Sequence, residues 1–412
     1  MSSARVTIVD PFSAGALLAE ALIARGAKCI AVISSADLPE NMRSRFDPDL
    51  FLDIVQYSGD FGTTLSALKS MEPSHVIAGC ESGVELAEQL AEQLGLPGND
   101  PAMRHARRDK FLMAEAVSAR GMRTARQFQL LDADQVVDRV RQEFNFPVIL
   151  KPARSTGSDL VFFCESIDAV ADAARQILSS NNVLGQRNDS VLVQEFLDGI
   201  EYVVDTVSLD GERKTTAFWQ YHRPSIPGRF VAYDAMTLLP YTGELQEALQ
   251  AYAYDTLDAL SIRFGPAHCE LMWCDDEPVL IEVGARLTGG MNAVLSGMCG
   301  GLSQLDETVE AILSPHSFRQ SIHDRPSLKR RAANVFLVPP RTGRLLAVNG
   351  LDRIERLPTL HSMSVPVSPG AKLKKVAGSI LLIDEDIASI ERDIGMIRTI
   401  QNDGLFEVEA LR

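Results

Sequence analysis

The stretch VLIEVGARLTGG (residues 279–290) places a single carboxylate, Glu282, near the end of an otherwise apolar run. A second apolar run, AHCELMW (residues 267–273), carries Glu270. Between the two lies the acidic segment CDDE (residues 274–277), whose aspartates are typical turn residues. The pattern predicts a β-hairpin, and a turn centred near the second aspartate places Glu270 directly opposite Glu282.

Two carboxylates that face each other on a sheet repel, which costs stability unless a positive group lies between them. Mg²⁺ is a candidate, because it takes oxygen ligands and commonly uses one or two carboxylates together with substrate phosphates. The alternative is an exposed face on which both carboxylates are solvated. Four apolar neighbours argue against full exposure: Leu271, Met272, Leu280 and Ile281.

Past the strand end, Arg286 offers a guanidinium that suits a substrate carboxylate or an acyl-phosphate oxygen. Gly289 and Gly290 follow it and give a ligand close access to the backbone.

The composition describes a globular protein. The chain has 412 residues, 46% of them hydrophobic, and 40 basic against 55 acidic residues give a net charge of -15. This acidic balance argues against a nucleic-acid binder, and we expect neither a membrane span nor a signal peptide. The six cysteines form no CxxC pair, so we expect reduced thiols in a cytoplasmic protein rather than a zinc site or disulfides.

The length predicts more than one domain, and the pattern changes between residues 1–121, 122–330 and 331–412. The first segment alternates β-branched runs with amphipathic helices, as in RVTIVD followed by GALLAEALIARG. This rhythm predicts a doubly wound parallel sheet, whose ligands gather at the carboxyl ends of its strands. In the third segment, VFLVPPRTGRL and GSILLID predict a small β-rich appendage of α+β type.

The segment AGCESG (residues 78–83) lies at such a strand end, so Glu81 and Ser82 are candidates for ligand contact. Equally, both residues suit the N-terminus of a helix. Further along, DPAMRHARRDKFLMAEAVSARGM (residues 100–122) predicts one helix with Lys110 beside several arginines. Taken alone, such a basic face is more often solvated surface than a phosphate site.

In the second segment, FPVILKPARSTGSDLVFF (residues 146–163) predicts a strand that ends at Lys151, a loop and a returning strand. Small loop residues let backbone N–H groups approach an anion, and the lysine adds a positive charge. This is a weak signal for phosphate binding, because the loop has one glycine and lacks the Walker A spacing. The loop residues are Ser155, Thr156, Gly157 and Ser158.

The segment QEFLDGIEY (residues 194–202) joins two strand-like runs through a short hinge. It is either an edge hairpin with Glu195 and Glu201 in water, or a hinge whose backbone meets a base edge while Glu201 accepts a ribose hydroxyl. His222 is either ordinary loop surface or a residue that touches substrate. Further candidates for the substrate lining are Tyr221, Arg223, Tyr233 and Asp234.

The ordered set of these motifs resembles the ATP-grasp superfamily. The resemblance rests on Lys110 in RRDK, Lys151 in VILKP, the STGS loop, QEFLDGIEY, Glu270 and IEVGAR. Within the superfamily the chain is similar to the L-amino acid ligases of the bacilysin-synthetase type, which join two free amino acids into a dipeptide. The similarity covers nearly the whole chain and implies an ATP-grasp fold, with the parallel-sheet domain before it and the β-rich appendage after it.

The resemblance also implies roles for individual residues. Lys110 and Lys151 would contact the ATP phosphates, Ser155 to Ser158 would cover them, and Glu195, Phe196 and Leu197 would meet adenine while Glu201 meets ribose. Glu270 and Glu282 would hold Mg²⁺, and Arg286 would act with Lys151 in catalysis by orienting the amino acid and its acyl phosphate. Further implied substrate contacts are Gly289, Gly290, Glu81, Ser82 and His222.

One position departs from the family pattern. Many ATP-grasp enzymes carry asparagine two residues after the second metal glutamate, where this chain has Gly284. The ligand set of a second magnesium is therefore open.

The predicted function is an ADP-forming ligase that uses ATP and Mg²⁺ to join two L-amino acids, as in dipeptide antibiotic biosynthesis. We expect small-molecule substrates and, by default, a homodimer. One alternative is an ADP-forming ATP-grasp ligase that uses a different amine or another nucleophile. The other is a nucleotide-binding protein that has the same scaffold but no catalytic activity.

Overall fold

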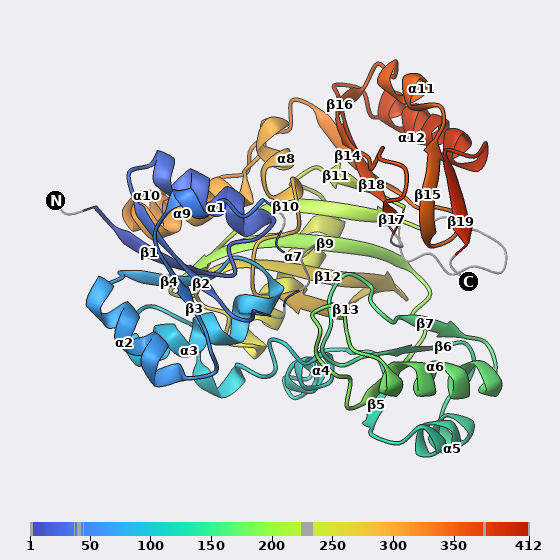
Figure 1. Cartoon of the computed structure of the whole chain (residues 1–412), viewed down its shortest axis with the longest axis horizontal. Helices are drawn as coiled ribbons and strands as arrows, with labels where there is room; N and C mark the ends of the chain where they lie inside the picture. The colour runs from blue at the N-terminus through green and yellow to red at the C-terminus, as the bar shows by residue number, and fades with distance from the viewer. Residues whose placement is uncertain are drawn as a thin grey trace.

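The N-terminal part of the chain forms a parallel sheet, drawn in blue on the left of Figure 1. The computed structural model describes residues 3–36, 38, 43, 45–223, 234–373 and 376–410. The first sheet has the strand order β3-β2-β1-β4, and every neighbouring pair is parallel. Its elements are β1 (Arg5–Val9), α1 (Ala14–Ala24), β2 (Lys28–Ile33), β3 (Phe51–Gln56), α2 (Phe61–Met71), β4 (His75–Ala78) and α3 (Val84–Leu94). The predicted doubly wound parallel sheet is confirmed.

The segment predicted as one long helix is broken. A short 3-10 helix (Pro101–Met103) is followed by turns, and α4 (Lys110–Ser118) begins only after Asp109. The Asp109 carboxylate accepts hydrogen bonds from the first-turn N–H groups of α4, which is why the helix starts there. The arginines before it are not a solvated face either, because Arg107 and Arg108 are buried in ion pairs with Glu88 and Glu81.

Replacing Arg107 by methionine is expected to lower the free energy of unfolding by about 3–5 kcal/mol, because it leaves the Glu88 carboxylate buried without its cation. In the native protein, Arg107 Nη2 lies 2.6 Å from Glu88 Oε2, and Nη1 donates to the carbonyl of Leu260 at 2.8 Å. Chemical denaturation measures the loss. The control is Arg353→Met, which breaks an exposed pair and is expected to cost less than about 1 kcal/mol; equal effects would contradict the prediction.

A small antiparallel sheet with the strand order β5-β8-β6-β7 lies at the lower right of Figure 1. Its strands are β5 (Gln127–Leu130), β6 (Val148–Lys151), β7 (Phe162–Cys164) and β8 (Val191–Glu195). Helices α5 (Ala133–Glu143) and α6 (Ile167–Ser179) share an apolar core with it. The face of this sheet away from the helices is therefore available to line a site.

A large antiparallel sheet crosses the middle of the molecule, in the order β13-β12-β9-β10-β11-β14-β18-β16. Five of its strands come from the second segment: β9 (Ile200–Leu209), β10 (Glu212–His222), β11 (Ala235–Leu239), β12 (Gly265–Cys274) and β13 (Glu277–Gly284). One face of β9, β12 and β13 packs against α7 (Glu244–Ala259) and α4 through residues such as Val204 and Leu271. Because strand side chains alternate between faces, the residues between these lie on the opposite face.

The chain passes from the small sheet to the large one through Gly199, between β8 and β9. A Cβ at this position would lie 2.2 Å from the carbonyl oxygen of Trp273, on β12. The connection therefore enters the large sheet with its backbone directly against the backbone of β12.

The third segment is not a separate sheet. Its strands β14 (Arg331–Leu337), β18 (Gly378–Asp384) and β16 (Leu360–Ser364) extend the large sheet past β11. A three-stranded sheet of β15 (Gly343–Val348), β17 (Lys372–Leu373) and β19 (Phe406–Ala410) lies beside them with α11 (Leu351–Glu355) and α12 (Ile387–Asn402). The remaining helices, α8 (Asn292–Met298), α9 (Gln304–Leu313) and α10 (Pro315–Gln320), connect β13 to this segment.

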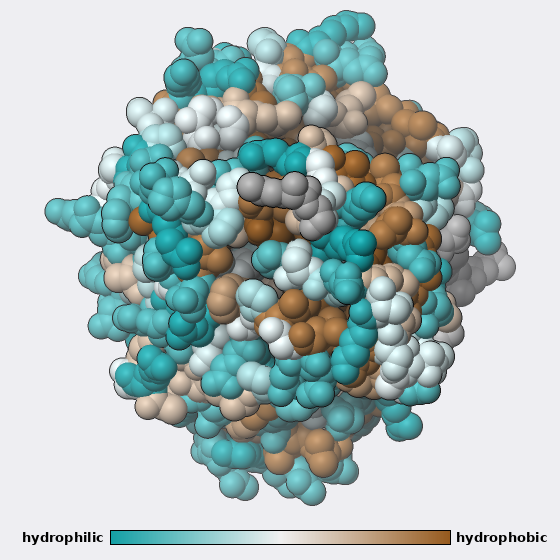
Figure 2. Space-filling model, turned by 90° about the vertical axis from the view of Figure 1, so that its left-hand side faces the viewer, coloured by the Kyte–Doolittle hydropathy of each residue, from teal (hydrophilic) through white to brown (hydrophobic). Residues whose placement is uncertain are grey.

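On the side of the N-terminal sheet the surface is mostly hydrophilic, with apolar patches near its middle (Figure 2). Among the residues that the structure describes, no helix combines the length and the apolar character needed to cross a membrane.

Candidate functional site

The predicted hairpin of Glu270 and Glu282 is confirmed, and the two residues are register partners on β12 and β13. The turn is tighter than predicted, however. Cys274 pairs with Glu277, and the two aspartates between them both have positive φ (54° and 62°), as a two-residue type I′ turn requires.

Continued regularly, this tight turn would place Glu282 opposite Cys269, on the helix-packed face. A β-bulge at Ile281 inserts one extra residue and restores the pairing of Glu282 with Glu270. Because one step of register turns a side chain to the other face of a sheet, the bulge is what brings both carboxylates to the same side.

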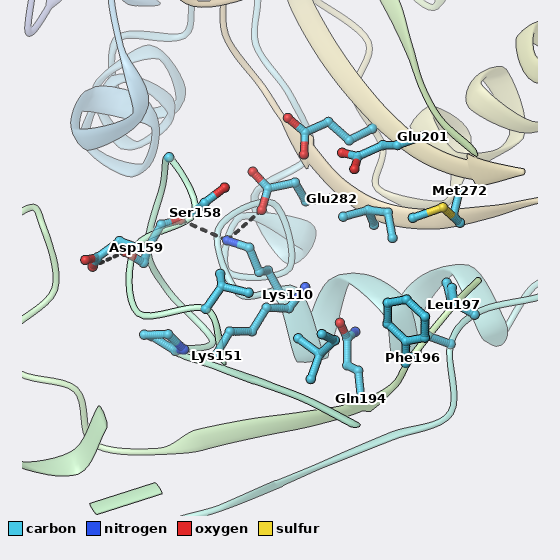
Figure 3. Close-up of a pocket in the computed structure, with 18 of the residues that line it drawn as sticks. Lys110, Lys151, Ser158, Asp159, Gln194, Phe196, Leu197, Glu201, Met272 and Glu282 are labelled. Atoms are coloured by element: carbon cyan, nitrogen blue, oxygen red, sulfur yellow. Dashed lines mark hydrogen bonds and ion pairs between the residues drawn. The ribbon is translucent and has the colours of Figure 1, made fainter. Parts of the chain in front are cut away.

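A cavity of about 940 Å³, part of it open to solvent, lies between the two antiparallel sheets. Figure 3 shows its interior, with Lys110 and Lys151 below Glu201 and Glu282, and Asp159 to the left beside Ser158. The small sheet and its loop contribute Ile149, Lys151, Pro152, Ser155, Thr156, Gly157, Ser158, Asp159, Val161, Gln194, Glu195 and Phe196. The large sheet contributes Glu201, Glu270, Met272, Ile281 and Glu282; Lys110, Ala125, Leu197 and Arg223 complete the lining. The cavity thus brings together both lysines, the loop, the hinge and both hairpin carboxylates.

The two lysines form the cationic part of the cavity. Lys110, the first residue of α4, places Nζ 2.8 Å from Glu282 Oε2 and 2.8 Å from the carbonyl oxygen of Ser155. Lys151, the last residue of β6, is buried, and burial together with the nearby charge of Lys110 lowers its pKa to about 8. Two neighbouring ammonium groups, one buried and one half-buried, favour an anionic ligand such as a polyphosphate.

The carboxylates carry an excess of negative charge. Burial and the charge of Glu270 raise the pKa of Glu201 to about 7, although Arg223 pairs with it.

Among the described residues, no group of three or more His, Cys, Asp or Glu side chains has the arrangement of a metal site. An ion between Glu270 and Glu282 would therefore take its other ligands from a nucleotide and water, which is the usual mode of Mg²⁺. The residues present fit this ion.

The small-residue loop after β6 closes one end of the cavity. The Ser155 hydroxyl donates to Asp159 at 2.8 Å, and Asp159 also accepts the backbone N–H of Val183 at 2.8 Å. Gly157 and Ser158 have positive φ. Asp159, which the sequence patterns did not single out, ties the loop to the connection between α6 and β8.

The hinge segment lies at the other end of the cavity. Glu195 is the last residue of β8 and Phe196 follows it. Glu195 accepts a hydrogen bond from the backbone N–H of Arg126 at 2.8 Å. Glu201 is buried within the large sheet, so the interpretation of this segment as a solvated edge hairpin is wrong. Met272, Ile281 and Leu197 supply an apolar surface here that suits a flat ring.

Arg286 does not point freely into the cavity. Its Nε donates to Glu81 Oε2 at 2.7 Å, and Arg108 pairs with the other oxygen of Glu81. Burial alone would raise the pKa of Glu81, but the two guanidinium groups outweigh it and lower the pKa to about 2. Glu81 thus positions Arg286 from the carboxyl end of β4.

The departure at Gly284 has a steric reason. A Cβ there would lie 2.9 Å from Arg286 Cζ and 3.2 Å from Glu81 Oε2. The guanidinium therefore occupies the space that a side chain would need.

Ser82 neither faces the cavity nor caps a helix. Its hydroxyl donates to Asp10 Oδ2 at 2.5 Å, and the 3-10 helix that contains it has no side-chain cap. Both the ligand-contact and the capping interpretations of Ser82 thus lack support in this structure.

The remaining candidates have mixed outcomes. His222 is the last residue of β10, not a loop residue, and its Nε2 lies 3.0 Å from Thr237 Oγ1. Asp234 is bound by the Arg398 guanidinium at 2.6 and 2.9 Å, and Tyr221 is buried. Tyr233 lies outside the described residues. Gly289 and Gly290 follow Arg286 with open space beside their Cα atoms.

Comparison with known proteins places this geometry in a family. A family model of the ATP-grasp domain matches residues 144–294. Dapdiamide A synthase of Enterobacter agglomerans is 31% identical over 413 residues, which cover 97% of this chain and 96% of that protein. An L-arginine-specific L-amino acid ligase of Bacillus subtilis is 23% identical over 307 residues, 71% of this chain and 69% of that protein.

Among solved structures, an L-amino acid ligase from Bacillus licheniformis superposes with a TM-score of 0.75 over the whole of both chains, at 18% identity. This likeness confirms the fold. The relative that matches along nearly its full length and the match to the ATP-grasp domain show that the chain belongs to the ATP-grasp ligase family.

Proposed function

We propose that the protein is an ADP-forming ligase that joins two L-amino acids into a dipeptide. The observation that supports it most is the cavity itself, in which Lys110 and Lys151 face Glu270 and Glu282 while Arg286 lies just past the end of β13. The names of two relatives, a dapdiamide A synthase and an L-arginine-specific L-amino acid ligase, agree with this class of reaction.

A carboxylate does not react with an amine directly, because its leaving group would be oxide. Transfer of the γ-phosphoryl group of ATP to the carboxylate oxygen gives an acyl phosphate and ADP. The amine of a second amino acid then attacks the carbonyl carbon, loses a proton and expels inorganic phosphate. Phosphoryl transfer needs mainly positioning and neutralisation of spread negative charge, rather than covalent help from the protein.

The residues of the cavity meet these needs. Lys110 and Lys151 would neutralise phosphate oxygens, and the loop after β6 would cover them. Glu270 and Glu282 would hold Mg²⁺, which supplies additional positive charge at the phosphates. Arg286, held by Glu81, would orient the acyl phosphate and stabilise the oxyanion that forms when the amine attacks.

A panel assay tests the proposal. The purified protein is incubated with ATP, Mg²⁺ and pairs of amino acids, and ADP, phosphate and dipeptide are quantified by mass spectrometry. We expect phosphate release that requires an amino acid, and hydroxylamine should trap the activated carboxylate as a hydroxamate. AMP and pyrophosphate as products would refute the proposal, whereas a product from another nucleophile would reassign the substrate class. ATP binding without turnover across the panel would instead indicate a non-catalytic nucleotide-binding protein.

The affinity for ADP is expected to fall as the pH rises above 8. Below its pKa of about 8 Lys151 is already protonated, so binding to phosphate requires no proton. Above that pH the ammonium form must be regenerated on binding, which weakens the affinity by up to about tenfold per pH unit. Glu201, with a pKa of about 7, stays ionised in this range. Titration with a fluorescent ADP analogue between pH 8 and 9.5 measures the slope of ADP affinity against pH.

The slope is expected to be lost in Lys151→Met and kept in Lys28→Met, which removes an exposed lysine at the start of β2. A slope that persists in Lys151→Met would show that another group is responsible.

A further inference from the structure

A buried histidine connects the carboxylate of Glu270 to the interior of the large sheet. His268 is 5% exposed and lies on β12, where its register partner on β9 is Asp205. Its Nδ1 is 2.7 Å from Asp205 Oδ1, and its Nε2 is 3.2 Å from Glu270 Oε1. Asp205 accepts a further hydrogen bond from Trp219 Nε1 at 2.8 Å. The four side chains form a continuous polar row from β10 to the proposed metal site.

The row follows from strand geometry. His268 and Glu270 are two residues apart, so they lie on the same face of β12. Asp205 is directly across from His268 on the neighbouring strand, close enough for a side-chain pair. These residues lie on the face opposite the core of α7, which is the face that carries Glu201 and Glu282.

Contacts at both ring nitrogens fix the plane of the imidazole. Nδ1 is held by Asp205 and Nε2 by Glu270, so the His268 ring cannot turn without breaking one of the two contacts.

We propose that His268 is a positioning residue, which Asp205 holds in place and which fixes the carboxylate plane of Glu270 for metal binding. The inference rests on the proposed function, because it requires that Glu270 is a ligand of the metal–nucleotide complex. Buried second partners of this kind orient metal ligands, and their loss typically costs about 10- to 100-fold in metal affinity.

The two hairpin carboxylates differ in the side chain that holds each of them. Glu282 is held by Lys110, a residue that also faces the place of the nucleotide phosphates. Glu270 is held by a side chain that belongs to the interior of the sheet. Of the two carboxylates, Glu270 is therefore the one whose orientation does not depend on the nucleotide.

Mn²⁺ binding in the presence of ADP tests the inference. Mn²⁺ is the probe, and the electron paramagnetic resonance signal of free Mn²⁺ gives its affinity for the full-length protein. His268→Ala is expected to weaken Mn²⁺ binding about 10- to 100-fold, while the affinity for ADP without metal stays at the wild-type value. His268→Gln keeps an N–H donor that reaches toward Glu270 and is expected to recover most of the affinity. Asp205→Asn is expected to give an intermediate loss.

The matched control is Lys214→Met, which breaks another buried ion pair in the same sheet. Lys214 Nζ lies 2.6 Å from Glu307 and 2.7 Å from Ser321, away from the proposed metal site. It is expected to lower the unfolding midpoint but to leave Mn²⁺ affinity unchanged.

Two results overturn the inference alone: wild-type Mn²⁺ affinity in His268→Ala and Asp205→Asn, or an equal loss in Lys214→Met. If His268→Ala does not fold, Asp205→Asn decides: wild-type Mn²⁺ affinity in this variant overturns the inference. Failure of the wild-type protein to bind Mn²⁺ with ADP would instead overturn the proposed function, and the inference with it.

Discussion

Replacing Glu282 by glutamine is expected to lower kcat/KM for amino-acid-dependent phosphate release by about 100- to 1,000-fold, and Glu270→Gln is expected to do the same. The amide keeps the size of the side chain but removes the negative charge that would hold Mg²⁺ at the phosphates. In the structure Glu282 also pairs with Lys110 at 2.8 Å, so the substitution frees that lysine as well. A coupled assay of phosphate release at saturating ATP measures the loss.

The control for this pair is Glu277→Gln, at the start of β13 on the same hairpin. The Glu277 side chain is 62% exposed, and its contact to Arg123 is long, at 3.8 Å. We expect wild-type activity in this variant. Full activity in Glu270→Gln or Glu282→Gln would refute the proposed metal site, and the ligase proposal would lose its main support.

Arg286→Met is expected to lower kcat by about 100-fold or more, with a smaller change in the KM for ATP. The guanidinium would act on the acyl phosphate and on the oxyanion, which form after ATP has bound. Arg286→Lys should recover little of the activity, because a lysine cannot reproduce the planar guanidinium that donates both to Glu81 and to the carbonyl of Leu287. Trapping with hydroxylamine distinguishes the two steps. Loss of the hydroxamate would show that the acyl phosphate no longer forms, whereas hydroxamate without dipeptide would show that the attack of the amine is lost.

Arg353→Met, which removes an exposed arginine on α11, is the matched control and is expected to retain full activity. The unfolding midpoint of Arg286→Met has to be measured as well, because Glu81 would keep only Arg108 as its cation. If Arg286→Met turns over at the wild-type rate, the arginine has no part in the chemistry.

The sequence predicted the pairing of Glu270 with Glu282, but only because two errors cancelled. The turn was placed half a residue too far along the chain, and the bulge at Ile281 was not foreseen. A bulge has no local signal in an apolar run such as VLIEV, since its extra residue is selected by the packing of the sheet. The parallel sheet and the strand ending at Lys151 were predictable because their patterns are local.

Contacts between distant parts of the chain explain most of what was missed. Arg107 and Arg108 resemble solvated surface until the folded chain brings Glu88 and Glu81 against them. The row from Trp219 to Glu270 joins three strands, and only its last step, His268 two residues before Glu270, is visible in the sequence. Alternation along AHCEL places both side chains on one face, which is the signal that could have identified the histidine.

The glycine at the crossing between the two sheets has a practical consequence. Since the carbonyl of Trp273 leaves no room for even a methyl group at position 199, any larger residue there would push the start of β9 away from β12, the strand that carries Glu270. Variant libraries of the hinge segment should therefore keep glycine at this position and vary Phe196 and Leu197, which line the cavity.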